Sequence, residues 1–60
     1  QALTTIRLEK SKELLLTTAM SVQDISEAVG FSSCSYFIKQ FKTAYHTTPA
    51  QYRQKMRSHL

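Results

Sequence analysis

Hydrophobic residues recur at helical spacing in four segments of the chain, and short polar stretches separate these segments. The first segment runs from Gln1 to Thr17 without glycine or proline and is rich in strong helix formers. The residues expected on its inward side are Leu8, Ser11, Leu14 and Leu15. Leu3 and Ile6 extend apolar character toward the N-terminus, where this short chain offers little to bury them. They predict an exposed surface that meets a partner.

The second segment should begin near Val22, because Ser21 followed by Asp24 resembles a capping box. Its inward residues are expected to be Val22, Ile25, Ala28 and Val29. Gly30 is the only glycine, and it can supply the left-handed residue that ends a helix.

Ser32 or Ser33 is expected to cap a third helix, which runs to about Tyr45. Thr48 and Pro49 predict the start of a fourth helix that frays near Ser58. With no strand signal and no repeat, the chain is predicted to be all-α, a small bundle of about four helices. The tight connection at Gly30 makes the second and third helices a candidate helix-turn-helix.

The predicted third helix has two distinct sides. Its core side is expected to hold Phe37, Phe41, Ala44 and Tyr45, and its outward side Ser35, Lys39, Lys42 and His46. Cys34, Tyr36, Ile38 and Thr43 are expected on the flanks. No acid lies on the outward side, as a helix that approaches DNA phosphates requires. The aromatic residues Phe31, Phe37, Phe41, Tyr45 and Tyr52 are interpreted as core, not as platforms for stacked bases.

Charge is divided unevenly along the chain, whose net charge is +4. The four acids, Glu9, Glu13, Asp24 and Glu27, all precede Ala28. The charged residues from Ala28 onward are all basic: Lys39, Lys42, Arg53, Lys55 and Arg57. A basic half of this kind favours a polyanion as partner, most often nucleic acid, although an ordinary solvated surface stays an alternative.

Other chemistry finds little support in the sequence. Sixty residues suffice for one small domain, and the single cysteine, Cys34, excludes an internal disulfide and fits a reducing compartment. Cys34 is interpreted as a small residue near the turn and not as a redox sensor. His46 and His59 make no metal motif, no catalytic triad can be assembled, and Gly30 alone forms no phosphate loop. We therefore expect no enzyme, cofactor or metal, and a cytoplasmic protein without a signal peptide or membrane span.

A specific resemblance emerges from three stretches of sequence. The segments 25–33, 35–37 with 41–42, and 48–53 closely resemble the signature of the AraC/XylS family of bacterial transcription regulators. Residues 7–15 look like the linker helix of that family. The resemblance implies a homeodomain-like helix-turn-helix fold, with a linker helix at 1–18, the helix-turn-helix at 21–46 and a C-terminal helix at 48–58. It also implies an upstream first helix-turn-helix subdomain, and often a sensor domain, in the same protein.

The resemblance also assigns roles to individual residues. Those expected to read bases are Cys34, Ser35, Tyr36, Ile38 and Lys39, and those expected to contact phosphates are Ser33, Lys42 and Arg53. Two positions depart from the family pattern. Ser26 replaces a frequent alanine, and Tyr45-His46 stands where Phe-Gly is common. A histidine must then form the left-handed end of the third helix, at a cost on the order of 1 kcal/mol.

These observations predict sequence-specific binding to double-stranded promoter DNA, with the third helix in the major groove. The alternative is a protein-interaction module, in which the basic and partly apolar surface docks on RNA polymerase or on a sensor domain. A steep dependence of binding on salt would favour DNA.

Overall fold

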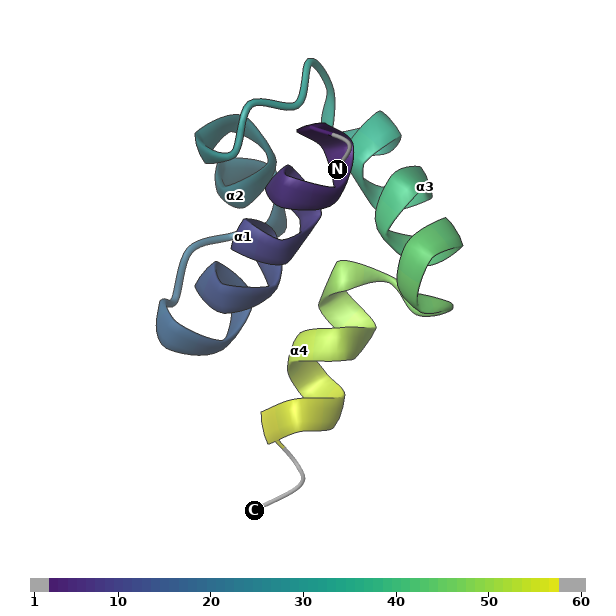
Figure 1. Cartoon of the computed structure of the whole chain (residues 1–60). Coiled ribbons are helices and arrows are strands. Elements are labelled where there is room, and N and C mark those ends of the chain that lie inside the picture. The colour runs from purple at the N-terminus through teal and green to yellow at the C-terminus, as the bar shows by residue number, and fades with distance from the viewer. Residues whose placement is uncertain (1–2, 58–60) are drawn as a thin grey trace.

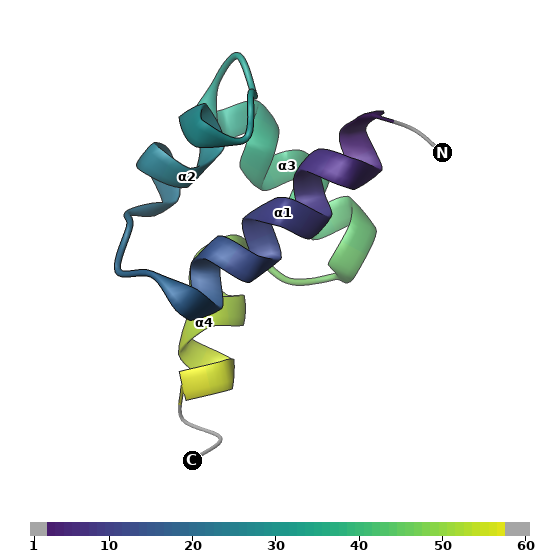
Figure 2. The same cartoon turned by 60° about the vertical axis from the view of Figure 1, so that its left-hand side comes forward.

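The computed structural model describes residues 3–57, and within them every regular element is a helix. The elements are α1 (Leu3–Thr17), α2 (Val22–Ala28), α3 (Cys34–Tyr45) and α4 (Pro49–Arg57). In Figure 1, α1 lies between α2 on the left and α3 on the right, and in Figure 2 it crosses in front of α3; α4 lies below the other helices in both views. The expected all-α bundle is confirmed. The predicted helical start at Gln1 and the predicted fraying near Ser58 lie outside the described residues.

Three helices begin at the polar caps that their sequences predict. The hydroxyl of Ser21 accepts a hydrogen bond from the Asp24 backbone N–H at 3.1 Å, and Ser33 caps α3 in the same way. At the start of α4, Thr48 accepts from the Gln51 N–H, while the Gln51 side chain accepts from the Thr48 N–H. These caps satisfy backbone donors that a helix leaves unpaired at its first turn.

A glycine and a histidine end the two central helices. Gly30 has φ of 98°, its N–H donates to the Glu27 carbonyl, and the Phe31 N–H donates to the Ser26 carbonyl. This pair of backbone hydrogen bonds is a Schellman motif, which needs a residue in the left-handed conformation at the position of Gly30. His46 ends α3 with φ of 62° and ψ of 22°, so the predicted left-handed histidine is confirmed.

The core lies where α1, α2 and α3 meet, and α4 covers its lower end. Its buried hydrophobic residues are Leu8, Leu15, Ile25, Phe31, Phe37 and Phe41. Ser11 and Ser26 are also fully buried, and each hydroxyl donates to the carbonyl three residues earlier, at 2.6 and 2.7 Å. The departure at position 26 is therefore accommodated without an unsatisfied hydroxyl. Leu3 and Ile6, by contrast, are 59% and 51% exposed, as expected.

Two alanines expected in the core are exposed, so those two predictions were wrong. On α2, Val22 and Val29 flank one side of Ile25, whereas Ala28 falls on the other side, away from the neighbouring helices. On α3, Ala44 lies two turns beyond Phe37, at a helix end where the large ring of Tyr45 makes the packing contact. Each alanine thus lies at the edge or end of the apolar side of its helix, where it stays exposed.

No helix within residues 3–57 is long and apolar enough to cross a membrane.

Candidate nucleic-acid interface

The outward side of α3 is the polar surface that its sequence predicts. Ser35, Lys39, Lys42 and His46 are all exposed. Tyr36 is also exposed, whereas Cys34 and Ile38 are half-buried at the edge, and Ile38 packs against the core. The five residues expected to read bases therefore share the first half of α3, and four of them come from its first five positions.

A continuous row of aromatic rings holds the inner side of α3. The centroids of Phe31 and Phe37 are 5.1 Å apart, and those of Phe37 and Phe41 are 5.9 Å apart. The Phe41 ring then contacts Tyr45 and Tyr52 edge-on, at 4.8 and 5.7 Å. Such tilted pairs add to the stability that burial itself provides. Phe31, Phe37 and Phe41 belong to the core, with Tyr45 and Tyr52 packed against it, and together they fix which side of α3 faces outward.

Ser33 stands at the beginning of this surface. Its hydroxyl oxygen accepts the Tyr36 N–H at 3.1 Å, while its backbone is extended, with φ of −148°. The hydroxyl keeps its own proton to donate, and the side chain is exposed. Cap and phosphate contact are therefore compatible at this residue.

A polar contact ties the other end of α3 to α1. The Tyr45 hydroxyl donates to Glu9 Oε2 at 2.7 Å, and Lys12 lies 3.7 Å from the same oxygen. Lys12 Nζ also lies 4.5 Å from the centre of the Tyr45 ring. The hydrogen bond from Tyr45, followed by the charge of Lys12, lowers the pKa of Glu9. Burial and the neighbouring Glu9 carboxylate raise the pKa of the Tyr45 hydroxyl.

Arg53 makes two contacts to the end of α1. Its Nε donates to the Leu15 carbonyl at 3.0 Å, and its Nη2 donates to the Thr18 carbonyl at 3.3 Å. These carbonyls belong to the C-terminal end of α1, where backbone acceptors lack helical partners. Arg53 thus joins α4 to α1.

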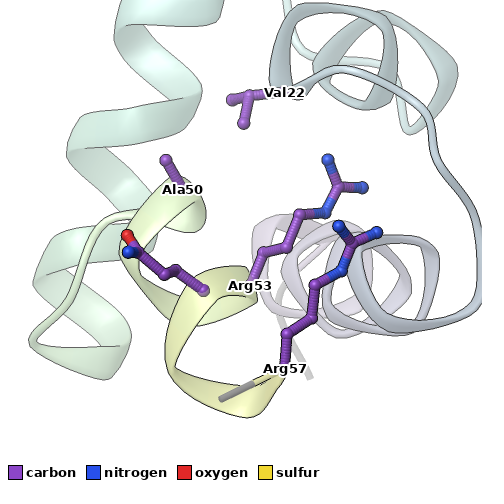
Figure 3. A pocket seen from close by; sticks show the side chains of 5 residues that line it. Val22, Ala50, Arg53 and Arg57 are labelled. Carbon is purple, nitrogen blue, oxygen red and sulfur yellow. The ribbon is translucent and has the colours of Figure 1, made fainter.

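Arg53 also lines a groove between α4 and the start of α2, with a volume of about 440 Å³. Figure 3 shows Arg53 and Arg57 extending side by side from α4, with Val22 across from Ala50. Within residues 3–57 no group of three metal-ligating side chains comes together.

A match to a family profile identifies the protein family to which the chain belongs. The profile described as "Helix-turn-helix domain" matches residues 1–55, nearly the whole chain. The chain belongs to the AraC/XylS-type helix-turn-helix family. It is a DNA-binding domain of the kind found in transcription regulators, and it is not an enzyme.

Named relatives and solved structures agree with this assignment. The chain is 47% identical over 47 residues to the xylose operon regulatory protein of Escherichia coli K12, covering 78% of this chain and 12% of that protein. The transcriptional activator PerA of Escherichia coli O127:H6 has the same identity, with 78% and 17% covered. The C-terminal domain of AraT, a response regulator from Geobacillus stearothermophilus, superposes with a TM-score of 0.83 at 44% identity, covering 87% of this chain and 43% of that chain.

The structure of the xylose-binding transcription activator XylR matches at a TM-score of 0.81 and 44% identity, covering 83% of this chain and 13% of that one. This AraC/XylS-type domain spans less than a fifth of the length of the xylose operon regulatory protein and of PerA.

Two arginines of the domain have structural surroundings that the sequence analysis missed. Arg53 was expected only at a phosphate, but two of its donors are engaged by the end of α1. Arg7, which had no expected role, lies against Gly30 in the turn between α2 and α3. Both contacts join residues more than twenty positions apart, so no local pattern in the sequence indicates them.

Proposed function

We propose that this AraC/XylS-type domain reads promoter DNA with α3 in the major groove, and that it is the linker helix and second helix-turn-helix subdomain of a larger regulator. The observation that carries the proposal is the acid-free outward side of α3, exposed next to a helix end that is capped and anchored. Residues near the beginning of such a helix reach base edges most readily. The protein would act in the cytoplasm, where promoter DNA lies.

The side chains on α3 suggest a division of labour. Lys39 is exposed one turn beyond Ser35, and can donate to guanine, while Ser35 can bond to several bases. The half-buried Ile38 can meet a thymine methyl group, and Cys34 and Tyr36 would line the groove walls. Lys42 and Ser33 would contact phosphates, which set the register without reading sequence. Arg53 would reach a phosphate only with donors that α1 leaves free.

The proposed place in a larger regulator is supported by α1. Leu3 and Ile6 are more than half exposed on its first turns, although both are large and apolar. The chain also matches less than half of the AraT C-terminal domain. An upstream helix-turn-helix subdomain that packs on the first turns of α1 would account for both observations.

The experiment that tests base reading compares two lysines of α3. Sites are selected from random DNA with the full-length polypeptide that contains this chain, and then selected again with Lys39→Ala and Lys42→Ala. We expect Lys39→Ala to change base preference at one position, where a good contact is worth about 1–3 kcal/mol. Lys42→Ala should weaken binding to all sequences alike. Equal and sequence-independent losses from both variants would contradict this division.

A second function is favoured by the groove between α2 and α4. Its apolar residues, Val22 and Ala50, face two arginine side chains, a combination suited to a protein partner such as RNA polymerase or a sensor domain. Salt dependence separates the two functions. Binding to DNA should weaken steeply as salt rises, because contacts to phosphates release counterions. A partner protein whose binding is insensitive to salt would favour the second function.

A further inference from the structure

The guanidinium of Arg7 lies directly on the turn that leads into α3. A Cβ atom placed on Gly30 would lie 3.2 Å from both Cζ and Nε of Arg7, and 3.4 Å from its Nη2. These distances are tighter than most Cβ contacts, so a side chain at position 30 would push the guanidinium aside by a few tenths of an ångström. The φ of 98° is what favours glycine at position 30, and the missing side chain also gives Arg7 room to approach the turn closely.

Among the residues that the structure describes, Arg7 is the one cation of α1 that pairs with no acid. Lys10 pairs with Glu13 at 3.2 Å, and Lys12 lies 3.7 Å from Glu9. Within residues 3–57, the Arg7 side chain makes no hydrogen bond or ion pair. Glu27, the acid closest to the turn along the chain, is not paired with it either.

The position of Arg7 adds charge where α3 has none. The first turn of α3 carries no charged side chain, and its nearest lysine is Lys39 in the second turn. Arg7 is half-buried against the turn, so part of its conformational freedom is already lost in the free protein. A guanidinium presents several donors in a rigid fork that matches the oxygens of a phosphate. Arg7 thus supplies a pre-positioned cation at the end of α3 that enters the groove first.

We infer that Arg7 is a further DNA-contacting residue, which binds a backbone phosphate beside the α2–α3 turn. This inference rests on the proposed function, because it needs α3 to lie in the major groove. On this inference α1 does not only link two subdomains, because its Arg7 also binds a DNA phosphate beside the turn at Gly30. The position of α1 against this turn would then set part of the affinity for DNA.

The test measures salt dependence with three variants of the full-length polypeptide. Fluorescence anisotropy follows binding to a selected duplex and to a scrambled duplex over a series of KCl concentrations. The variants are Arg7→Gln, Arg7→Lys and the matched control Lys10→Gln, which removes the same charge from a lysine already paired with Glu13. For Arg7→Gln we expect affinity to fall several-fold on both duplexes, and the slope of log K against log[KCl] to shrink by about 0.9. Arg7→Lys should keep the slope, and Lys10→Gln should keep both slope and affinity.

Four results would overturn the inference. One is an unchanged slope in Arg7→Gln together with a lower melting temperature, since that would show Arg7 only to support the turn. Another is equal losses from Arg7→Gln and Lys10→Gln, which would indicate a general charge effect. If Lys42→Ala reduces the slope while Arg7→Gln does not, DNA binding by α3 stands and the role of Arg7 fails. Absence of DNA binding by the unmodified protein would refute the proposed function itself, and this inference with it.

Discussion

The Tyr45 hydroxyl donates a 2.7 Å hydrogen bond to Glu9 across 36 positions of sequence, and so joins the end of α3 to α1. Lys12 completes the contact, because it lies near both the carboxylate and the ring. Arg7, on the same helix, touches the turn before α3. The linker-like helix α1 therefore contacts both the turn before α3 and the last residue of α3, the helix proposed to read DNA.

Removing the Tyr45 hydroxyl should make the stability of the domain depend less on pH in the acidic range. The pKa of Glu9 is lowered from its ordinary value of 4.5, so its contribution is present above that pH and is lost as the pH falls through the lowered value. Tyr45→Phe should therefore melt a few degrees lower than the unmodified chain at neutral pH, and the difference should shrink below about pH 4.5. Thermal unfolding followed by circular dichroism measures this.

Tyr36→Phe is the control for that measurement, since the Tyr36 hydroxyl makes no hydrogen bond among the residues that the structure describes. A Tyr45→Phe difference that stays constant as the pH falls well below 4.5 would show that the Glu9 carboxylate is not its source.

Replacing His46 by glycine should stabilise the domain. His46 is left-handed, with φ of 62°, and glycine adopts this conformation without the steric cost of a Cβ atom. After the entropy that glycine loses on folding, we expect a net gain of roughly 0.5–1 kcal/mol in the free energy of unfolding. That corresponds to a rise of about 2–8 °C in melting temperature for a domain of this size. His46→Ala keeps the Cβ atom, so an equal rise there would contradict this explanation.

Loss of the Arg53 side chain should destabilise the junction of α1 and α4. Arg53→Met keeps much of the apolar stem but leaves the carbonyls of Leu15 and Thr18 without their partner. A partly buried acceptor left unsatisfied costs about 1–3 kcal/mol, and chemical denaturation should show it. Arg57→Met, one turn later on an exposed position, should change stability by less than about 0.5 kcal/mol. Similar losses from both variants would mean that the two carbonyl contacts contribute nothing.

The cap of α3 allows a comparison of adjacent serines. Ser33→Ala removes the acceptor for the Tyr36 N–H, and should lower the free energy of unfolding by about 0.5–2 kcal/mol. Ser32→Ala should have almost no effect, because Ser32 is exposed and precedes the cap. Urea unfolding of both variants tests whether Ser33 is the N-cap of α3. A larger decrease in the free energy of unfolding for Ser32→Ala than for Ser33→Ala would contradict it.

Much of the fold could be predicted from local sequence. The caps at Ser21 and Thr48, the serine cap of α3 and the ending at Gly30 each depend on residues within about one helical turn, so their signals survive in a single sequence. The sequence left Ser32 and Ser33 open as the cap of α3, and the structure places it at Ser33. Helical spacing also placed Phe37 and Phe41 inside and Lys39 and Lys42 outside. Spacing failed at Ala28 and Ala44, because it describes the direction of a side chain but not how far the neighbouring helices extend.

The outward residues of α3 were predicted for the same local reason, and their roles at DNA stay predictions. The contacts of Arg7, Arg53 and Tyr45 could not be anticipated, since each joins α1 to a segment that follows much later in the chain. Local hydrogen bonding and helical periodicity depend on residues that are close together in the sequence. They account for the four helices and for the polar side of α3. Which long polar side chain meets which distant backbone or carboxylate depends on how those helices pack, and packing exists only once the whole domain has folded.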